Sequence, residues 1–277
     1  MAVTLSVHRA LADLEEQNET GALCTIVRSQ GSTPRHVTSK MLVYPDGHII
    51  GTVGGGEMES RVIAEALLAI EDGKPRLLQY SMSDPGRGDP GVCGGQLEVF
   101  VEPMQPKPTL VVIGSGHVGK AVAHLAHWLG FRVAVNDDRP DFCTPQAVPD
   151  ADEYFPVPMA DLPGRLKITP WTYLVLTTRG ANVDVAGLPA LLDTPAAYIG
   201  VIGSKRRWAT SRKLMLEQGV PEEKLKRVRS PIGLELRAET PEEIALSILA
   251  EIIMLRQGGD ATPMQEIATF VPERPQL

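Results

Sequence analysis

Hydrophobic and polar positions follow two different rhythms along this chain. Up to about residue 104, short apolar runs stand between glycine-rich turns, which is typical of strands joined by tight connections. Beyond that point, continuous apolar runs alternate with helical spacing, as in a parallel sheet covered on both faces. The first part predicts strands at 22–27, 41–44, 48–53, 77–82 and 96–101 and a helix at 57–72; the second predicts strands at 109–113, 132–136, 173–177 and 197–202 and a helix at 118–129.

The most clearly marked helix begins after Thr240. Thr240 is a suitable N-cap, Pro241 suits the first helical position, and Glu243 stands where a capping box needs a glutamate. Apolar residues then recur at helical spacing as far as Gly258, where the helix is expected to end.

Three prolines between Glu102 and Pro108 mark the change of rhythm. Proline disfavours helix and removes strand hydrogen-bond donors, so this stretch predicts an extended linker. We therefore expect an α/β protein of two domains. Residues 1–104 would form a small α+β domain, and residues 105–277 a Rossmann-like domain with a doubly wound parallel sheet.

Composition narrows the choice of partners. The net charge of −7, from 27 basic and 34 acidic residues, argues against a nucleic-acid partner. No apolar run reaches the roughly 18 residues of a spanning helix, and the first 17 residues resemble an amphipathic helix more than a signal peptide, so no membrane association is expected. The three cysteines form no CxxC pair, which favours a reducing, cytoplasmic location.

A GxGxxG motif lies directly between a predicted strand and a predicted helix. Gly114 and Gly116 would allow a tight turn and close approach of a phosphate to the backbone, and Gly119 would let helix and strand pack closely. His117 would open the helix, whose first N–H groups face an anion. The motif predicts a dinucleotide-like ligand, but a glycine turn without a ligand remains an open alternative.

The next strand ends in three charged residues, Asp137, Asp138 and Arg139, about 20 residues after the glycine turn. An acid at this place can accept hydrogen bonds from a ribose, whereas the arginine could bind a phosphate. These residues are therefore candidate cofactor-binding groups.

A second glycine turn follows the strand at 197–202. Gly203 and Ser204 precede three cations, Lys205, Arg206 and Arg207, at the sheet edge where α/β proteins bind ligands. This arrangement suits a phosphate or a pterin-type anion, and a solvated helix start is an equally good interpretation.

The first half carries glycine-rich segments with reactive neighbours. Arg35 adds a cation after Gly31, and Gly55 and Gly56 could form an anion-binding nest at a helix start. Cys93 stands beside two further glycines, Gly94 and Gly95, after an arginine-containing loop.

An exposed thiol near positive charge can act as a thiolate, so Cys93 is the candidate reactive thiol, although a buried structural role is the alternative. Cys24 is expected in the core of the first half, and Cys143 in a loop.

Taken together, these segments resemble the XdhC/CoxI proteins, accessory factors of xanthine dehydrogenase and related molybdenum hydroxylases. The resemblance spans nearly the whole chain, in the order of the family's motifs. The matching segments are GSTPRHVTSKMLV (31–43), GTVGGGEMES (51–60), VCGGQLEVFVEP (92–103), VIGSGHVGKAV (112–122), NDDRPDF (136–142), YIGVIGSKRR (198–207) and PIGLELRAETPEEIALSILAEI (231–252).

The resemblance implies an N-terminal XdhC domain joined to a C-terminal Rossmann domain, in a homodimer. It also implies binding of the molybdenum cofactor, as molybdopterin or its dinucleotide, with Cys93 a candidate molybdenum ligand. Sulfuration of the cofactor by a cysteine desulfurase and delivery to the large subunit of a xanthine dehydrogenase-type hydroxylase would follow. Such a protein would be a chaperone more than an enzyme.

Two positions depart from the family pattern. Ala181 stands where a histidine is expected after Thr-Arg-Gly, and Arg237 stands where a glycine is common.

Two other function classes stay open. An NAD(P)-dependent oxidoreductase would use the glycine turn and Asp137, although no acid–base pair for hydride transfer is evident. An interaction scaffold would use neither site.

Overall fold

The computed structural model describes residues 2–82 and 94–266, with side chains from residue 6 onward. The chain forms two compact units, Met1–Pro106 and Lys107–Leu277, so the division falls two residues beyond the expected boundary. Within the described ranges, no helix combines the length and apolarity needed to cross a membrane.

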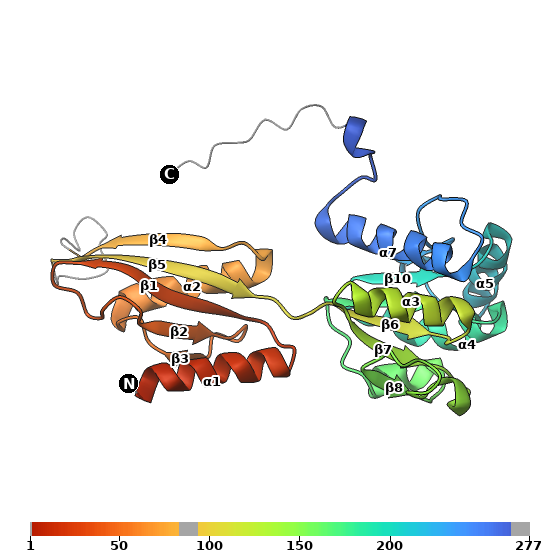
Figure 1. Ribbon diagram of the computed structural model, residues 1–277, viewed down its shortest axis with the longest axis horizontal. Helices are drawn as coiled ribbons and strands as arrows, with labels where there is room; N and C mark the ends of the chain where they lie inside the picture. The colour runs from red at the N-terminus through yellow and green to blue at the C-terminus, as the bar shows by residue number, and fades with distance from the viewer. Residues whose placement is uncertain (1, 83–93, 267–277) are drawn as a thin grey trace. The chain divides into compact units, whose positions relative to one another are not determined.

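The first unit is a five-stranded antiparallel sheet with strand order β3-β2-β1-β5-β4 (Figure 1). Its helices pack on opposite faces, because the side chains of a strand alternate between faces. Leu42 packs with Leu14 of α1, whereas Met41 and Val43 pack with Val62 of α2. Its elements are α1 (Ala2–Glu16), β1 (Gly21–Gln30), β2 (Lys40–Val43), β3 (Ile49–Gly51), α2 (Gly56–Asp72), β4 (Arg76–Ser81) and β5 (Gln96–Met104).

The expected linker begins inside a strand. β5 continues to Met104, and Pro103 pairs with Ala22 of β1. The ladder between β4 and β5 ends at Val101, so beyond it β5 has β1 as its sheet neighbour. Proline is tolerated there because one edge of the strand needs no donor.

The second unit is a six-stranded parallel sheet with strand order β11-β10-β9-β6-β7-β8, which confirms the expected doubly wound α/β class (Figure 1). Its strands are β6 (Thr109–Ile113), β7 (Arg132–Asn136), β8 (Glu153–Phe155), β9 (Thr172–Leu176), β10 (Tyr198–Val201) and β11 (Val228–Arg229). Its helices are α3 (His117–Trp128), α4 (Ala181–Leu192), α5 (Lys205–Glu217), α6 (Glu222–Leu225) and α7 (Pro241–Gln257), with 3-10 turns η2 (Pro140–Phe142), η3 (Met159–Gly164) and η4 (Met264–Glu266).

Helices cover both faces of this sheet. Leu110 and Val112 of β6 point to the cluster that includes α3 and α7. Val111 and Ile113 point to the other cluster, which includes α4, α5 and η3. The chain leaves β6 toward β7 and β8 and later returns to β9 on the opposite side of β6. A topological switch point therefore lies at the carboxyl end of β6, where ligands of such sheets bind.

Helix α7 begins and ends where the sequence signals predict. Thr240 accepts from the Glu243 amide, and the Glu243 carboxylate accepts from the Thr240 amide, which confirms the capping box. Gly258 ends α7 with φ +72°. Arg237 adopts φ +54°, a left-handed conformation that favours glycine, so the departure from the family pattern falls where the backbone makes glycine useful.

Candidate functional site

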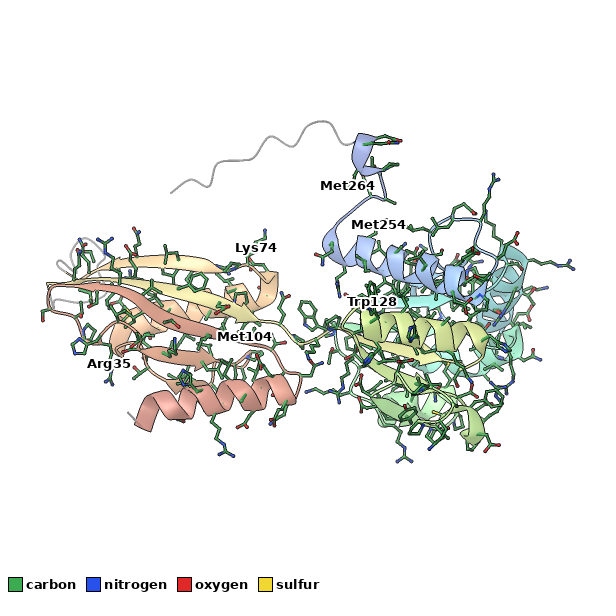
Figure 2. The ribbon with its side chains drawn as sticks, in the orientation of Figure 1. Arg35, Lys74, Met104, Trp128, Met254 and Met264 are labelled. Atoms are coloured by element: carbon green, nitrogen blue, oxygen red, sulfur yellow. The ribbon has the colours of Figure 1, made fainter. Side chains whose placement is uncertain are left out.

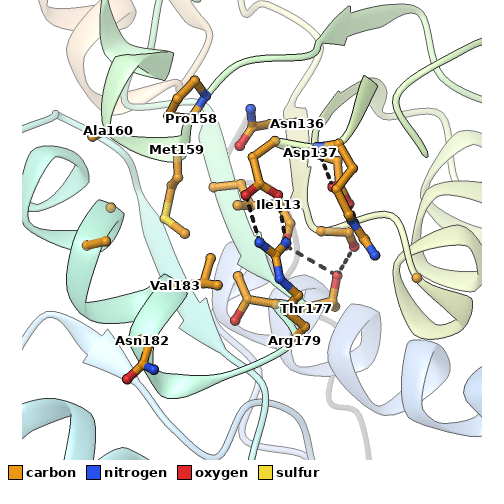
Figure 3. Close-up of a pocket in the computed structure, with 17 residues that line it drawn as sticks. Ile113, Asn136, Asp137, Pro158, Met159, Ala160, Thr177, Arg179, Asn182 and Val183 are labelled. Atoms are coloured by element: carbon orange, nitrogen blue, oxygen red, sulfur yellow. Dashed lines mark hydrogen bonds and ion pairs between the residues drawn. The ribbon is translucent and has the colours of Figure 1, made fainter. Parts of the chain in front are cut away.

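A cavity of about 430 Å³ opens at the switch point of the parallel sheet (Figure 3). Its lining comes from the ends of β6, β7 and β9, from the first turns of α4 and from the start of η3. The lining residues are Ile113, Gly114, Gly116, Asn136, Asp137, Asp138, Arg139, Pro158, Met159, Ala160, Thr177, Thr178, Arg179, Asn182, Val183, Ala186 and Gly187. Five predicted site residues are thus brought together: Gly114, Gly116, Asp137, Asp138 and Arg139.

The three glycines of the turn have different roles. Gly114 has φ +101°, and its amide donates to the Asn136 carbonyl over 2.8 Å. A Cβ on Gly119 would overlap the Gly114 carbonyl oxygen, so this glycine allows α3 to pack against β6. A Cβ on Gly116 would meet no atom within 4 Å, so the turn is open toward the cavity. His117 is exposed and does not line the cavity.

The Asp137 carboxylate is buried and fully hydrogen-bonded within the protein. Oδ1 accepts from the Arg139 amide (3.1 Å) and Nε (2.8 Å), and Oδ2 accepts from Arg139 Nη2 (2.8 Å) and the Ser115 amide (2.9 Å). These four N–H groups match the four acceptor sites of a carboxylate. The Arg139 guanidinium also stacks on Phe142, 3.8 Å from the ring centroid. The Asp137 carboxylate therefore has no acceptor position left for a ligand, and the Arg139 guanidinium is held to it through Nε and Nη2.

Burial would raise the pKa of Asp137, but the hydrogen bonds from Arg139 and Ser115 hold it at about 2. A carboxyl whose pKa is lower in the folded than in the unfolded protein stabilises the fold at pH values above its unfolded pKa. This stabilisation is lost as the pH falls from about 4 toward 2, and from the lowered pKa it amounts to roughly 2 kcal/mol.

Replacing Asp137 with asparagine should remove this pH-dependent stabilisation. We expect Asp137→Asn to be less stable than the wild type at pH 7 by roughly 2 kcal/mol, with a difference that shrinks as the pH falls through 3. Urea unfolding between pH 2 and 7, followed by tryptophan fluorescence, measures both. Asp161→Asn, at an exposed carboxyl of η3, is the control. A difference independent of pH would contradict the prediction.

A second ion pair crosses the mouth of the cavity. Arg179, three residues beyond the end of β9, donates from Nη1 and Nη2 to Oδ1 and Oδ2 of Asp138, two residues beyond the end of β7, over 2.6 and 2.8 Å (Figure 3). Because β6 lies between β7 and β9, this pair passes over the end of β6 and its glycine turn. Both side chains are exposed, at 50% and 39%. The Arg179 contact lowers the pKa of Asp138.

The rest of the cavity wall is largely apolar. Met159 from η3 and Val183 from α4 project toward the cavity from one side, with Pro158 and Ala160 beside Met159 (Figure 3). Asn136 keeps the chain before Pro158 in place, since its Nδ2 donates to the carbonyls of Phe155 and Val157 over 2.8 Å. Asn182 adds a polar amide at the first turn of α4. The wall suits a planar ring system that carries a few polar groups.

The second glycine turn does not reach the cavity. Ser204 caps α5 by accepting from the Arg207 amide at 3.2 Å, and Lys205 and Arg206 are exposed. Arg207, the third cation of this run, turns inward.

Arg207 supports the wall of the cavity from behind. Its guanidinium donates to Asp184 Oδ2 (2.7 Å) and to Thr178 Oγ1 (2.6 Å), and the Thr178 hydroxyl donates to Asp184 Oδ1. Asp184 is fully buried in the first turn of α4. This network joins the end of β9, the start of α4 and α5 into one rigid support.

In the first unit, the expected anion nest binds a side chain of the protein. The amides of Val53 and Gly55 donate to Glu59 Oε2 over 3.1 and 3.2 Å, and the Thr52 hydroxyl donates to the same oxygen. The Glu59 carboxylate, in the first turns of α2, therefore satisfies the donors that precede this helix. The anion at these amides is a side chain of the protein, and the expected binding of a ligand by Gly55 and Gly56 stays a prediction.

Three glycine segments of the first unit lie close together. Gly54 lies against Pro34, since a Cβ on Gly54 would be 2.9 Å from Pro34 Cγ. A Cβ on Gly31 would be 3.2 Å from both the Gly94 carbonyl and the Gly95 Cα. Arg35, next to Pro34, is exposed (Figure 2). The structure thus gathers the glycine motifs at one place.

The cysteines separate into two groups. Cys24 is fully buried, and burial raises its pKa to about 12, so it is a core residue as expected. Cys143 lies in a loop after η2, as expected, but it is buried; its Sγ donates to the Val135 carbonyl over 3.3 Å, and burial raises its pKa. Cys93 lies outside the described residues, so its role as thiol or molybdenum ligand stays a prediction.

Comparisons with known proteins agree with this architecture. Residues 110–252 match the model described as the XdhC Rossmann domain, and residues 14–81 match the XdhC and CoxI family. The chain is 38% identical over 261 residues to "Uncharacterized protein YqeB" of Escherichia coli, covering 92% of this chain and 47% of that protein. It is 33% identical over 159 residues to a Bacillus subtilis protein described as a probable subunit of xanthine dehydrogenase, covering 57% and 46%. The chain thus spans about half the length of these two relatives.

Two further matches extend along most of the chain. The "Molybdenum cofactor insertion chaperone PaoD" of Escherichia coli is 24% identical over 264 residues, covering 84% of this chain and 83% of that protein. A crystal structure described as a xanthine dehydrogenase from Bacillus halodurans has the same fold, with a TM-score of 0.50, 24% identity and coverage of 93% and 98%. The chain therefore belongs to the XdhC and CoxI family, and its second unit contains the family's Rossmann domain.

Proposed function

We propose that this protein binds the molybdenum cofactor, as molybdopterin or its dinucleotide, and delivers it to the large subunit of a xanthine dehydrogenase-type hydroxylase. The cofactor is the cargo in this proposal, and the protein acts as a cytoplasmic chaperone. Acceptance of sulfur from a cysteine desulfurase while the cargo is bound, and assembly as a homodimer, are further parts of the proposal.

The observation that carries the proposal is the closed Asp137–Arg139 pair. An NAD-dependent oxidoreductase uses an acid near this place to bind the ribose hydroxyls. In this protein both oxygens of Asp137 are filled by N–H groups of Arg139 and Ser115. Among the described lining residues, the groups that could move a proton are the carboxylates of Asp137 and Asp138, and both are held in ion pairs with arginines. These features favour binding over hydride transfer.

The cavity has properties that suit the cargo. Molybdopterin is a pterin derivative with a flat, polar ring system and a phosphate, and its dinucleotide form adds a nucleoside monophosphate, which creates a pyrophosphate. The apolar wall around Met159 and Val183 suits such a ring, and the open position at Gly116 leaves room for a phosphate at the first N–H groups of α3. The volume of about 430 Å³ lies within the range of small-molecule sites.

The relatives support the same interpretation. One is named as a molybdenum cofactor insertion chaperone, and it aligns over 84% of this chain. Another is named as a xanthine dehydrogenase subunit, which favours a hydroxylase of that type as recipient.

Retention of the cargo tests the proposal. The full chain is purified gently from cells that make the molybdenum cofactor, and bound small molecules are identified by mass spectrometry. We expect a molybdopterin-type ligand with the wild type and about tenfold less with Gly116→Val, whose branched side chain would block the turn. Gly164→Val is the matched control, because a Cβ there meets no atom within 4 Å and Gly164 does not line the cavity.

Two results would contradict the proposal. Retained NAD(P) together with steady-state oxidation of NADPH would favour the oxidoreductase. Activation of an apo-hydroxylase by a protein that never retains the cofactor would favour the scaffold.

A further inference from the structure

The four charged residues of the cavity lining form two ion pairs that differ in accessibility. Asp137 is 3% exposed and accepts four N–H groups, and its partner Arg139 also stacks on Phe142. Opening this pair would leave a buried carboxylate with backbone amide donors but without a cation, which costs much more than opening a pair in solvent. Arg139, the cation that the sequence suggested for a phosphate, is therefore held on Asp137 through Nε and Nη2.

The Asp138–Arg179 pair differs in that its carboxylate is exposed as well as its guanidinium. Both side chains are more than a third exposed, so solvent screens their attraction and the pair contributes little to stability. The geometry is bidentate, at 2.6 and 2.8 Å, which is also how a guanidinium binds a phosphate. A phosphate can therefore replace the Asp138 carboxylate on Arg179 without loss of hydrogen bonds.

The position of the pair connects it to the ligand turn. The pair runs from the end of β7 to the end of β9 and so passes over the end of β6, where the turn from Gly114 to Gly116 begins (Figure 3). An anion that approaches the first N–H groups of α3, which follow this turn, meets the Asp138 carboxylate, which repels it, and the Arg179 guanidinium, which attracts it.

We propose that Arg179 is the phosphate-binding residue of this cavity and that Asp138 occupies it until a phosphorylated ligand takes the place of the carboxylate. The ligand class is a phosphate or pyrophosphate ester, which includes both nucleotides and phosphorylated pterins. Asp138, once released, becomes an acceptor for N–H or O–H groups of the same ligand. The inference deepens the proposed function, because it concerns the same cavity. It requires only that the ligand carries a phosphate group, whichever ring system is attached.

Inorganic pyrophosphate is the probe, because it carries the shared chemistry without a ring. Isothermal titration of the full chain compares the wild type with Asp138→Asn and Arg179→Gln. We expect Asp138→Asn to bind pyrophosphate about fivefold tighter, since the competing charge is gone, and Arg179→Gln to bind it at least about tenfold more weakly. Both positions are exposed, so melting curves should match the wild type.

A second exposed ion pair in the same domain provides matched controls. Arg212 of α5 pairs with Glu222 of α6 at similar exposure, and neither lines the cavity. Glu222→Gln and Arg212→Gln change the net charge by the same amounts and should leave the affinity for pyrophosphate unchanged.

The outcomes separate this inference from the proposed function. Wild-type affinity in Arg179→Gln, no gain in Asp138→Asn, or no binding by either the wild type or Asp138→Asn would overturn the inference. Retention of the molybdenum cofactor by Arg179→Gln at the wild-type level would overturn it while leaving the proposed function intact. The expected pyrophosphate result in a protein that retains no molybdenum cofactor would leave Arg179 as the phosphate site and reject the cargo.

Discussion

Gly119→Ala is expected to destabilise the second unit by about 3 kcal/mol, although it adds a single methyl group. The new Cβ would overlap the Gly114 carbonyl oxygen and lie 2.9 Å from Thr177 Oγ1. Both obstacles belong to the parallel sheet and the turns that follow it, so α3 would have to move away from β6. That movement would also separate α3 from the apolar cluster that it shares with α7.

The position of the tryptophans lets fluorescence report the unfolding of the second unit. All three tryptophans, Trp128, Trp171 and Trp208, lie in the second unit, so tryptophan fluorescence during urea unfolding reports that unit in the full chain. Gly116→Ala is the control, because its Cβ meets no atom within 4 Å and it should cost less than about 1 kcal/mol. Equal unfolding midpoints for the two variants would show that α3 can adjust its position freely.

A similarly large effect is expected when the network behind the cavity loses its carboxylate. Asp184→Ala should cost about 3 kcal/mol, because the Arg207 guanidinium would keep its contacts to Thr178 but lose its only anionic partner among the described residues. Arg207→Ala should cost at least as much, since Asp184 is fully buried and would be left charged without a cation.

The double variant tests whether the two residues act together. If they form one unit, Asp184→Ala with Arg207→Ala should be more stable than the sum of the single effects predicts, by more than about 1 kcal/mol. Glu222→Ala, which breaks the exposed pair with Arg212 of α5, should cost less than about 1 kcal/mol. Additive effects at positions 184 and 207 would mean that the network is three independent contacts.

The sequence predicts the frame of the second unit well because its strongest signals are local. The run of five apolar residues at β6, the strand at β7 and the capping box at Thr240 each depend on near neighbours in the chain. The signal of the glycine turn is equally local, since the geometry of a strand–turn–helix unit requires a glycine at each of these positions.

The elements that the sequence did not predict have conflicting or weak local signals. α4 contains Gly187 and Pro189, which normally interrupt a helix, but it is held by burial of Leu188 and Leu191 in the core. β8 and β11 are three and two residues long, too short for periodicity to show.

The site was predictable in its place more than in its chemistry. The residues of the glycine turn and the Asp137–Arg139 segment line the cavity, but their partners were not visible in the sequence. Asp138 pairs with Arg179, 41 residues further along the chain. The two residues follow β7 and β9, which end at the same edge of the sheet on either side of β6. A charged residue at the end of a strand beside the switch point, as in Thr178-Arg179-Gly180, was the available signal.

The complete pairing of charges in the cavity has a kinetic consequence. Two aspartates and two arginines give the described lining a formal charge of zero, within a chain of net charge −7. The electric field of the protein therefore provides no long-range attraction for an anion, and diffusional encounter is not accelerated by steering. The association rate of a phosphorylated ligand should therefore not fall as the ionic strength rises, in contrast to a steered site, and any change should be an increase as salt screens the net negative charge.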